Sequence, residues 1–510
     1  MAVLLVLSLR LTSGRLIYPL DDTYIQMAMA KNTVLHGIWG VTRYGFSSSS
    51  SSPLWTSLIA GTYLLFGVNE TAPFVLSLLF GTAAVIVTHS VLSQHVSSQR
   101  WVFAGCLLSI FLTPLPSIAF LGMEHALHAV LALGLVWLVA KILASGERLS
   151  LRDVMQLALL FALLTAVRYE GLFLALVVCV LLLLNRRFAP TFGVAAGAAI
   201  PPVAYGVWSV SQGGLFLPNS VLVKGSLPGP GVKGIVQTLF GYVAWANAGK
   251  SPDLLLLLIV AAFLLVLQTW KKPAWSASTY TLVLFVGTAV LHLNFAQAGS
   301  LYRYDAYLVL VGLTAVTAAA WEFRPAIRTI PLASPRRAAA ALFLLLVFSP
   351  LVIRAARFLG TLPQASKNIY EQQYQMGRFL GRYYCDRPVA VNDIGAVSFL
   401  ADVRLLDLWG LAGPELARLK LHNQYTDELP LGRAKQEGVE VALVYRQWFS
   451  SPAWTEVGQW RIRGNVTCAH DDVSIYAVDS SATAELVRNL RAFASDLPAD
   501  VEQSGLYTQK

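Results

Sequence analysis

The sequence has few charged residues and few cysteines for its length. Of its 510 residues, 13% are Asp, Glu, Lys or Arg, whereas 56% are hydrophobic. A soluble globular protein carries about 25% charged residues, so this composition excludes a wholly soluble chain. The abundance of aliphatic and aromatic residues excludes a disordered one. The four cysteines include no CxxC pair, which excludes a cysteine-based metal framework.

Acidic residues are scarce relative to basic ones. The chain has 38 Lys and Arg against 28 Asp and Glu, which gives a net charge of +10. Nucleic-acid binding needs a clustered basic face, but these cations stand singly between apolar runs. They fit cytoplasmic loops that obey the positive-inside rule. We therefore expect membrane lipids, and no nucleic acid, among the partners.

Apolar segments recur from the N-terminus to Ile353. A full span needs roughly 20 apolar residues, and several segments are shorter, which is typical of tilted, broken or paired helices around a cavity. We predict a polytopic α-helical membrane domain over residues 1–353, with about 11–13 spans, some short or broken. The clear segments lie near residues 53–66, 72–92, 101–112, 124–144, 154–167, 171–184, 192–210, 254–270, 278–293, 306–321 and 338–353.

The first apolar segment is awkward because it ends at Arg10. It fits a signal peptide, although no small-x-small cleavage site follows it. It also fits a short complete span, or a chain whose true start lies upstream. We favour the upstream start.

Cation-rich loops set the orientation. Basic residues gather at residues 141–152, 185–187, 271–272 and 324–337, in alternate loops. Such loops face the cytoplasm. The turn at Arg168, the loops at residues 211–253 and 302–305 and everything after Arg354 are then on the outer side. Single spans counted from residue 1 to 141 would put the first loop, at about residues 20–52, on the wrong side, so an outer first loop requires the Pro-broken stretch 101–121 to cross an even number of times or not at all.

Residues 354–510 have the composition of an ordinary soluble domain. Short β-rich runs such as VAVNDIG and VEVALVYRQW alternate with helical stretches, which predicts a C-terminal soluble α/β domain. Asp393, Asp407 and Trp409 fit a plain β-core, with acceptor recognition as the alternative, so we leave all three out of the catalytic set. Cys385 and Cys468 are the two cysteines of this domain, and an oxidising exterior predicts a disulfide between them.

Two adjacent carboxylates, Asp21 and Asp22, follow the first apolar segment. A carboxylate at the edge of a bilayer is costly unless it is used. The alternative is that Asp22 or Thr23 caps a helix beginning at Tyr24, with Asp21 favourable at the helix dipole. The two interpretations are compatible, and the residues alone leave both open.

Further charges lie at the edges of apolar segments. Glu124 begins one in FLGMEHALHAV, where an ordinary carboxylate at a helix N-terminus is the alternative to a functional acid. Arg168 lies in the turn AVRYEGLFLAL, where a private ion pair with Glu170 is the alternative. Lys224 and Arg303 lie in outer loops, where a lone cation usually contacts lipid headgroups. If several of these cations instead gathered near the paired carboxylates of Asp21 and Asp22, together they would form a site that holds an anion.

The chain resembles the GT-C superfamily of polytopic glycosyltransferases, which use polyprenyl-phosphate sugars. Within that superfamily it is similar to bacterial, in particular mycobacterial, arabinofuranosyltransferases. The resemblance covers nearly the whole chain. The matching segments are, in order, DDTYI, GFSSSSSSPLW, GMEHALHAVLAL, RYEGLFLAL, LPNSVLVK, LYRYDAYL and VAVNDIGAVSFLADVRLLDLWGL.

The resemblance implies a reaction and a place for it. A sugar moves from a polyprenyl-phosphate donor to a hydroxyl of a cell-envelope glycan, glycolipid or glycoprotein. The enzyme lies in the bacterial inner membrane, with its active site and C-terminal domain facing the periplasm or exterior. An Asp of the first outer loop is the general base, and direct displacement inverts the anomeric carbon. We assign Asp21 as base and Asp22 as orienter, acceptor binder or metal contact.

The resemblance also suggests residues that bind substrate. Cations in a low-dielectric site stabilise the leaving phosphate best, and our order of preference is Arg303, Lys224 and Arg168. Mg²⁺ or Mn²⁺ at Asp21 and Asp22 is a candidate cofactor, because both ions prefer oxygen ligands. Further substrate-binding candidates are Glu124, Arg43, Tyr302 and Asn219.

Two other functions compete with glycosyl transfer. A transporter or flippase of lipid-linked sugars needs charges near the midplane of paired repeats, whereas this sequence has no internal repeat and its acids lie at membrane edges. A noncatalytic envelope-assembly scaffold would bind glycan through its outer domain.

Overall fold

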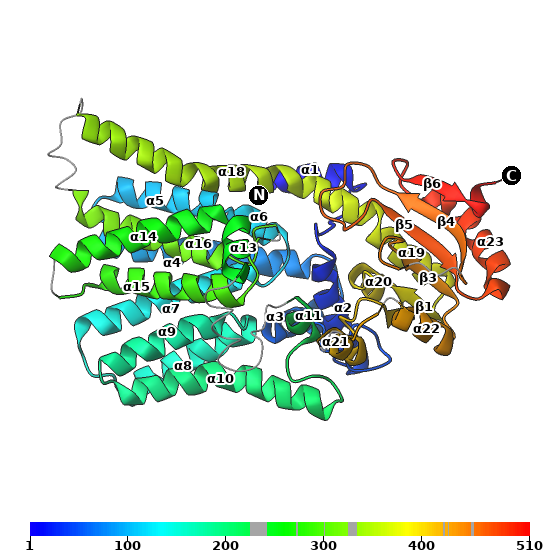
Figure 1. The fold of residues 1–510 in the computed structure, drawn as a ribbon, viewed down its shortest axis with the longest axis horizontal. Helices are drawn as coiled ribbons and strands as arrows, with labels where there is room; N and C mark the ends of the chain where they lie inside the picture. Colours follow the sequence, from blue (N-terminus) through cyan, green and yellow to red (C-terminus); the bar gives the residue numbers. More distant parts are fainter. Residues whose placement is uncertain are drawn as a thin grey trace. The chain divides into compact units, whose positions relative to one another are not determined.

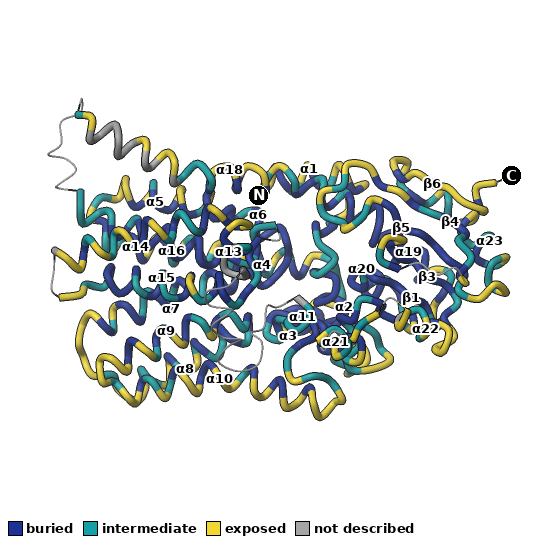
Figure 2. The backbone as a smooth tube through the Cα atoms, in the orientation of Figure 1, coloured by how far each residue is buried: buried dark blue, intermediate teal, exposed yellow. Residues whose placement is uncertain are grey.

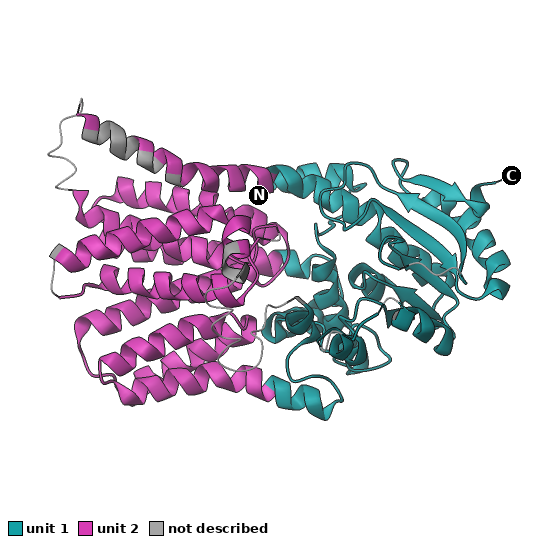
Figure 3. Ribbon diagram, viewed as in Figure 1, with its two compact units in different colours: residues 1–74, 205–224, 360–510 teal, residues 75–204, 225–359 magenta. Residues whose placement is uncertain are grey.

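The computed structural model describes residues 1–224, 242–271, 274–299, 301–324, 334–421, 424–426, 428–449 and 453–509. The chain divides into two compact units, drawn in different colours in Figure 3. Unit 1 comprises residues 1–74, 205–224 and 360–510, and unit 2 comprises residues 75–204 and 225–359. The loop predicted at about residues 20–52 and the C-terminal domain therefore belong to one unit.

Unit 2 is helical and apolar. Its helices expose large apolar side chains on their outer faces, including Leu79, Ile86 and Phe103, and a helix that is apolar all round is typical of a membrane environment. Figure 2 shows α16 as one of the most buried helices of this unit. The helices of unit 2, some extending past its bounds, are α4 (Ala72–His95), α5 (Gln99–Leu112), α6 (Leu115–Phe120), α7 (His125–Ser145), α8 (Leu151–Val167), α9 (Gly171–Leu184), α10 (Phe188–Ser211), α13 (Tyr242–Lys250), α14 (Pro252–Lys271), α15 (Ala277–Phe295), α16 (Ala306–Glu322) and α18 (Pro335–Glu371).

The predicted polytopic membrane fold is confirmed. Among the described residues, five helices are long and apolar enough to cross a bilayer, namely α4, α7, α10, α14 and α15. Shorter apolar helices of 10–17 residues accompany them, and α5, α9 and α16 are among these. They coincide with short segments expected from the sequence. The total of about 11–13 spans stays a prediction.

Unit 1 contains a mixed six-stranded sheet with the strand order β2-β1-β3-β5-β4-β6 (Figure 1). β1 lies between β2 and β3 and is parallel to both, whereas the remaining pairs are antiparallel. The predicted C-terminal α/β domain is confirmed by this sheet. The elements of unit 1 are α1 (Ala2–Leu11), α2 (Asp21–His36), α3 (Pro53–Phe66), α11 (Asn219–Lys224), α19 (Gln373–Tyr383), β1 (Pro388–Val391), α20 (Gly395–Leu400), β2 (Arg404–Asp407), α21 (Pro414–Leu421), α22 (Glu428–Gln436), β3 (Val441–Val444), β4 (Thr455–Arg461), β5 (Asp472–Ala477), α23 (Thr483–Phe493) and β6 (Glu502–Gly505).

The two faces of this sheet have separate cores, because alternate residues of a strand point to opposite faces. Val389 and Val391 of β1 face a core that includes residues of α19, α20 and α23, whereas Ala390 faces a core that includes residues of α22. Ile25 and Met29 of α2 join the first core. Burial of each such side chain contributes about 1.5–3 kcal/mol. Helix α2 is therefore packed onto the C-terminal sheet.

The predicted disulfide is absent from the structure. Cys385 and Cys468 are free thiols. The Cys385 thiol contacts the carbonyl oxygen of Asp402 at 3.6 Å, and the Cys468 thiol contacts Oε1 of Gln373 at 3.4 Å. The prediction was wrong because it rested on compartment and count, whereas the fold gives the two thiols different neighbours.

Candidate active site

Asp21 begins α2 and is fixed by the start of α20. Its carboxylate accepts hydrogen bonds from the backbone N–H of Gly395, at 2.7 Å, and of Ala396, at 2.8 Å. The approach is close enough to require glycine: a Cβ on Gly395 would lie 2.1 Å from the carbonyl oxygen of Asp21 and 2.8 Å from its carboxyl carbon. The backbone after β1 therefore sets the position of this carboxylate.

Capping does not account for the two carboxylates. The helix begins at Asp21, three residues earlier than the capping alternative supposed, and its N-cap is Leu20, which makes no side-chain cap. Asp21 and Asp22 lie in the first turn, where negative charge is favourable at the helix dipole. Both residues are half-buried.

A third carboxylate, Asp393, completes this cluster. It follows β1 and accepts hydrogen bonds from the hydroxyl of Tyr445, at 2.6 Å, and from Nε2 of Gln373, at 2.8 Å. We define the carboxylate cluster as Asp21, Asp22 and Asp393. The sequence interpretation had left Asp393 out as a plain β-core residue.

The position of Asp393 in the sheet indicates a ligand site, and the sequence interpretation missed this signal. Asp393 follows β1 and Tyr445 follows β3, so both lie at the carboxyl ends of parallel neighbours. The chain continues from β1 to β2 on one side of β1, while β3 lies on the other side. In open α/β sheets, ligands bind at such a switch point, outside the carboxyl ends of the strands.

The cluster resists full ionisation. The pKa of Asp21 is raised from its ordinary value to about 7, mainly because the carboxyl group is buried and also because Asp393 is close, while the hydrogen bonds from Ala396 and Gly395 oppose the rise. Burial also raises the pKa of Asp393, against the hydrogen bonds from Tyr445 and Gln373. Asp21 is therefore able to exchange a proton near neutral pH.

The metal site suggested at Asp21 and Asp22 has no support from the arrangement of the described side chains. Across the described ranges, no group of three or more His, Cys, Asp and Glu side chains is arranged to hold a metal ion. The candidate Mg²⁺ or Mn²⁺ at Asp21 and Asp22 stays a prediction, and no step proposed below uses it.

In unit 2, the structure brings together Arg168, Glu124 and Arg303. Nη1 of Arg168 donates to Oε1 of Glu124 at 2.6 Å, and the same guanidinium also pairs with Glu170. The ring of Tyr304 lies 5.3 Å from the Arg168 guanidinium and 4.8 Å from that of Arg303. Nη2 of Arg303 also donates to the Tyr304 hydroxyl at 3.0 Å.

These groups balance in charge and are deeply buried. Glu124, Arg168 and Arg303 are 0%, 5% and 4% exposed. Arg168 has two carboxylate partners, so the ion pair that the sequence left open is present. Asp21 and Asp22 belong to unit 1 and these residues to unit 2, so convergence of the cations on the carboxylates stays a prediction.

The remaining substrate-binding candidates from the sequence lie at four separate places in the structure. Arg43 pairs with Asp386 at the surface of unit 1. Tyr302 accepts a hydrogen bond at its carbonyl oxygen from Nη2 of Arg354, at 2.7 Å. Asn219 is buried and donates through Nδ2 to the carbonyl oxygen of Leu411, at 3.1 Å. Lys224 ends α11, but its side chain lies outside the described residues.

A buried ion triad in unit 2 escaped the sequence analysis. Nη1 of Arg354 donates to Asp253 at 2.5 Å, and both terminal nitrogens donate to Asp305 at 3.0 Å. All three side chains are at most 3% exposed. In the sequence, Arg354 was noted only as the point where the apolar segments end. Nothing in the sequence shows that α18 packs against α14 and the start of α16, which carry the two acidic partners.

The architecture defines a class: a multi-pass helical membrane protein that carries a mixed α/β domain. Two crystal structures share this fold, those of ArnT from Cupriavidus metallidurans bound to undecaprenyl phosphate and in the apo state. Each has a TM-score of 0.52, with 13% and 14% identity respectively, over 94% of this chain and 97% of that one. At this identity the likeness establishes the fold alone, and a shared membrane fold is what the sequence resemblance predicted.

The other comparisons give less information about this protein. The mycobacterial arabinofuranosyltransferase AftD, in its R1389S mutant, matches with a TM-score of 0.44 and 14% identity, over 94% of this chain and 41% of that one. Residues 367–476 match a family described as a domain of unknown function, DUF8728. The comparison with curated proteins finds no match.

Proposed function

We propose that the protein is an inverting membrane glycosyltransferase that moves a sugar from a polyprenyl-phosphate donor to a hydroxyl of a cell-envelope glycan or glycolipid. The carboxylate cluster carries this proposal. Asp393 follows the parallel strand β1, the backbone at Gly395 and Ala396 holds the Asp21 carboxylate, and the pKa of Asp21 is raised to about 7. A carboxyl group with that proton affinity is suited to general-base work at neutral pH.

The chemistry follows from the acceptor and the leaving group. An alcohol has a pKa far above 7, so a carboxylate that takes its proton as the new bond forms speeds the reaction by about 10²- to 10⁴-fold. We assign this role to Asp21, with Asp22 orienting the acceptor. The lipid phosphate is already a good leaving group, so a second carboxylic acid is not required, unlike in ordinary glycoside hydrolysis.

The departing phosphate gains negative charge, which a buried cation stabilises. We assign this first to Arg303, whose side chain is buried in the helical unit at 4% exposure. Lys224 is the second choice. The fold shared with an ArnT structure bound to undecaprenyl phosphate supports a polyprenyl-phosphate donor.

We place the enzyme in the bacterial inner membrane, with the membrane domain at residues 1–353 and an extracytoplasmic domain at residues 354–510. Cation-rich loops on the opposite side support this orientation. The packing of α2 onto the C-terminal sheet supports an active site that needs both the first outer loop and this domain.

Purified protein supplied with undecaprenyl-phosphate sugars and envelope glycan tests the proposal. Wild-type protein should transfer sugar, whereas Asp21→Asn should lose about 10²- to 10⁴-fold in turnover and Asp22→Asn should also be impaired. Asp479→Asn, at an exposed carboxylate that caps a 3-10 helix in the same unit, is the matched control.

Each contrary outcome points to a different correction. If both Asn variants transfer sugar at the wild-type rate, the base assignment is wrong. If wild-type protein moves lipid-linked sugar across vesicles without transferring it, the protein is a flippase. Glycan binding with neither activity would make it a scaffold.

A further inference from the structure

One end of unit 2 gathers five basic side chains. α7 and α9 end there, and α8 and α10 begin there (Figure 1). The two turns are joined directly, because Nη1 of Arg187 donates to the carbonyl oxygen of Ile142 at 3.2 Å. The starts of α8 and α10 are also packed together, since a Cβ on Gly193 would lie 2.5 Å from Cγ1 of Val154. We define the basic patch as Lys141, Arg148, Arg152, Arg186 and Arg187.

The charges of the basic patch are not balanced within the protein. Four of its side chains are exposed, and Arg187 is half-buried. Among the residues that the structure describes, none of the five cations forms an ion pair. The neighbouring acids are Glu147 and Asp153, and the Asp153 carboxylate accepts from the N–H and the hydroxyl of Ser150, at 2.9 and 2.7 Å. Five cations against two carboxylates leave three positive charges without a partner.

Arg186 has a cationic side chain at a backbone position that favours glycine. Its φ is +55°, in the left-handed region that residues with a Cβ rarely adopt. The turn uses this conformation to end α9, where the N–H groups of Arg186 and Arg187 donate to the carbonyl oxygens of Leu183 and Leu182, each at 2.8 Å. Glycine would adopt it without steric cost, so the shape of the turn does not explain an arginine. A partner outside the protein for its charge does.

The basic patch lies at the end of exposed apolar helix faces. Leu151, Met155 and Leu159 recur at every fourth position of α8 and therefore share one face, and they are 61–76% exposed. Phe188 and Phe192 of α10 are 61% and 77% exposed. An apolar face that ends in unpaired cations matches an anionic lipid, whose acyl chains contact the helices while its headgroup contacts the cations. A soluble polyanion would use the cations alone.

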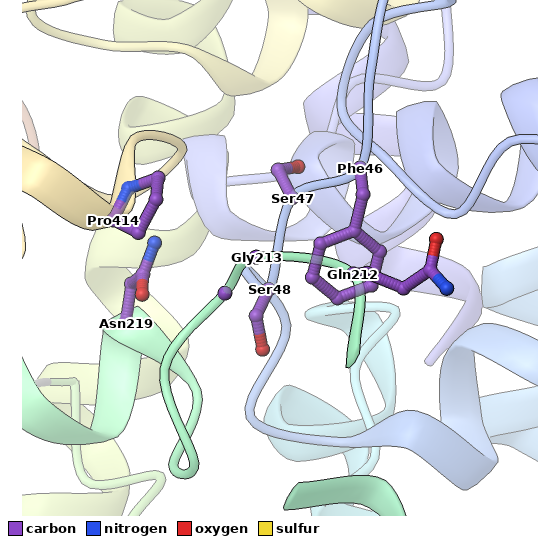
Figure 4. Close-up of a pocket in the computed structure, with 8 residues that line it drawn as sticks. Phe46, Ser47, Ser48, Gln212, Gly213, Asn219 and Pro414 are labelled. Carbon is purple, nitrogen blue, oxygen red and sulfur yellow. The ribbon is translucent and has the colours of Figure 1, made fainter. Parts of the chain in front are cut away.

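The small pocket in unit 1 is a different kind of feature. Phe46, Ser47, Ser48 and Gln212 are among the uncharged residues that line it (Figure 4), and its volume is about 40 Å³. One water needs roughly 10–15 Å³, so the pocket holds a few waters and no lipid headgroup. An anionic headgroup is therefore expected on the open basic patch of unit 2 and not in this cavity.

We propose that the basic patch binds the headgroup of an anionic membrane phospholipid, with the acyl chains on the exposed faces of α8 and α10. Three excess positive charges match a headgroup with two phosphates better than one with a single phosphate, so cardiolipin is the probe. In the orientation proposed above, the basic patch faces the cytoplasmic leaflet. The interaction does not involve the carboxylate cluster, so it is tested independently of glycosyl transfer.

Titration of fluorescent cardiolipin into detergent-purified full-length protein measures the affinity. Wild-type protein should bind cardiolipin saturably, phosphatidylglycerol more weakly and phosphatidylcholine not at all. Each cation near a membrane surface is worth about fivefold in affinity, so Arg152→Gln should lose about fivefold and the double variant with Arg148→Gln about 25-fold. Arg100→Gln, at an exposed cation near the start of α5 and outside the basic patch, is the matched control and should leave the affinity unchanged.

Arg186→Gly separates lipid binding from folding. Glycine suits this backbone conformation, so the unfolding temperature without lipid should be unchanged or higher. Cardiolipin affinity should nevertheless fall about fivefold, and added cardiolipin should stabilise the variant less than the wild-type protein. Unchanged affinity in Arg152→Gln and Arg186→Gly, or an equal loss in Arg100→Gln, would overturn the proposal. Displacement of cardiolipin by an equal concentration of inorganic phosphate would also refute it, because the site would then recognise an anion without the lipid.

Discussion

Gly395 is predicted to be essential for activity although it carries no side chain. A Cβ at this position would lie 2.1 Å from the backbone oxygen of Asp21 and 2.8 Å from its carboxyl carbon. Ordinary carbon contacts are about 3.5–4.0 Å, so Gly395→Ala must move the start of α2 by more than about 1 Å. The obstructing atom is backbone, so rotation of a side chain cannot relieve the contact.

The displacement has a predictable cost. It breaks the hydrogen bonds from Gly395 and Ala396 that hold the Asp21 carboxylate, and a misplacement of 1 Å in a catalytic group costs about 10²-fold in rate. Overpacking also destabilises a fold by about 1–3 kcal/mol. We therefore expect Gly395→Ala to lose about 100-fold in turnover, with a modest fall in unfolding temperature.

The assay pairs initial rates of sugar transfer from an undecaprenyl-phosphate sugar with thermal unfolding of the same sample. Gly432→Ala in α22 is the matched control, because a Cβ there meets nothing within 4 Å. Wild-type turnover in folded Gly395→Ala would refute the argument that this backbone positions the base. A variant that is unfolded at the assay temperature would be expressed and assayed at lower temperature, with the same comparison.

Three further predictions test the electrostatics. Activity should fall below about pH 7 because the raised pKa of Asp21 keeps its carboxyl group protonated there. Asp393→Asn removes a neighbouring charge, so the acid limb of the pH–rate profile should move down by about one pH unit, or about 1.4 kcal/mol. An acid limb that does not move in this variant would contradict the coupling between the two carboxyl groups. Arg303→Gln should weaken undecaprenyl-phosphate binding by roughly tenfold or more, the value of a charged hydrogen bond, measured by titration with the lipid; unchanged affinity would place the phosphate elsewhere. Arg354→Leu removes the cation that pairs with the buried carboxylates of Asp253 and Asp305, so it should destabilise unit 2 by about 3–5 kcal/mol. The loss should appear as a lower unfolding temperature in detergent, and an unchanged temperature would show that the triad is dispensable.

Composition and periodicity were enough to predict the membrane helices and the α/β domain. Burial in lipid requires long apolar runs, so segments such as 125–145 and 277–295 are visible in the sequence without any knowledge of neighbours. The alternation of Val389, Ala390 and Val391 likewise reflects a strand with two covered faces. Asp21 and Asp22 were identifiable because carboxylates next to an apolar segment are rare and costly.

Only the tertiary structure related residues that are distant along the chain. Asp393 lies more than 370 positions after Asp21, yet the backbone at Gly395 and Ala396 holds the Asp21 carboxylate. The Arg354 triad has the same character, since it depends on which elements pack together. Sequence pattern reports the environment that a segment requires, whereas hydrogen bonding and charge pairing depend on distances that exist only after folding. The sequence alone therefore determined the class of this protein, and the fold decided which of its charged groups form a site.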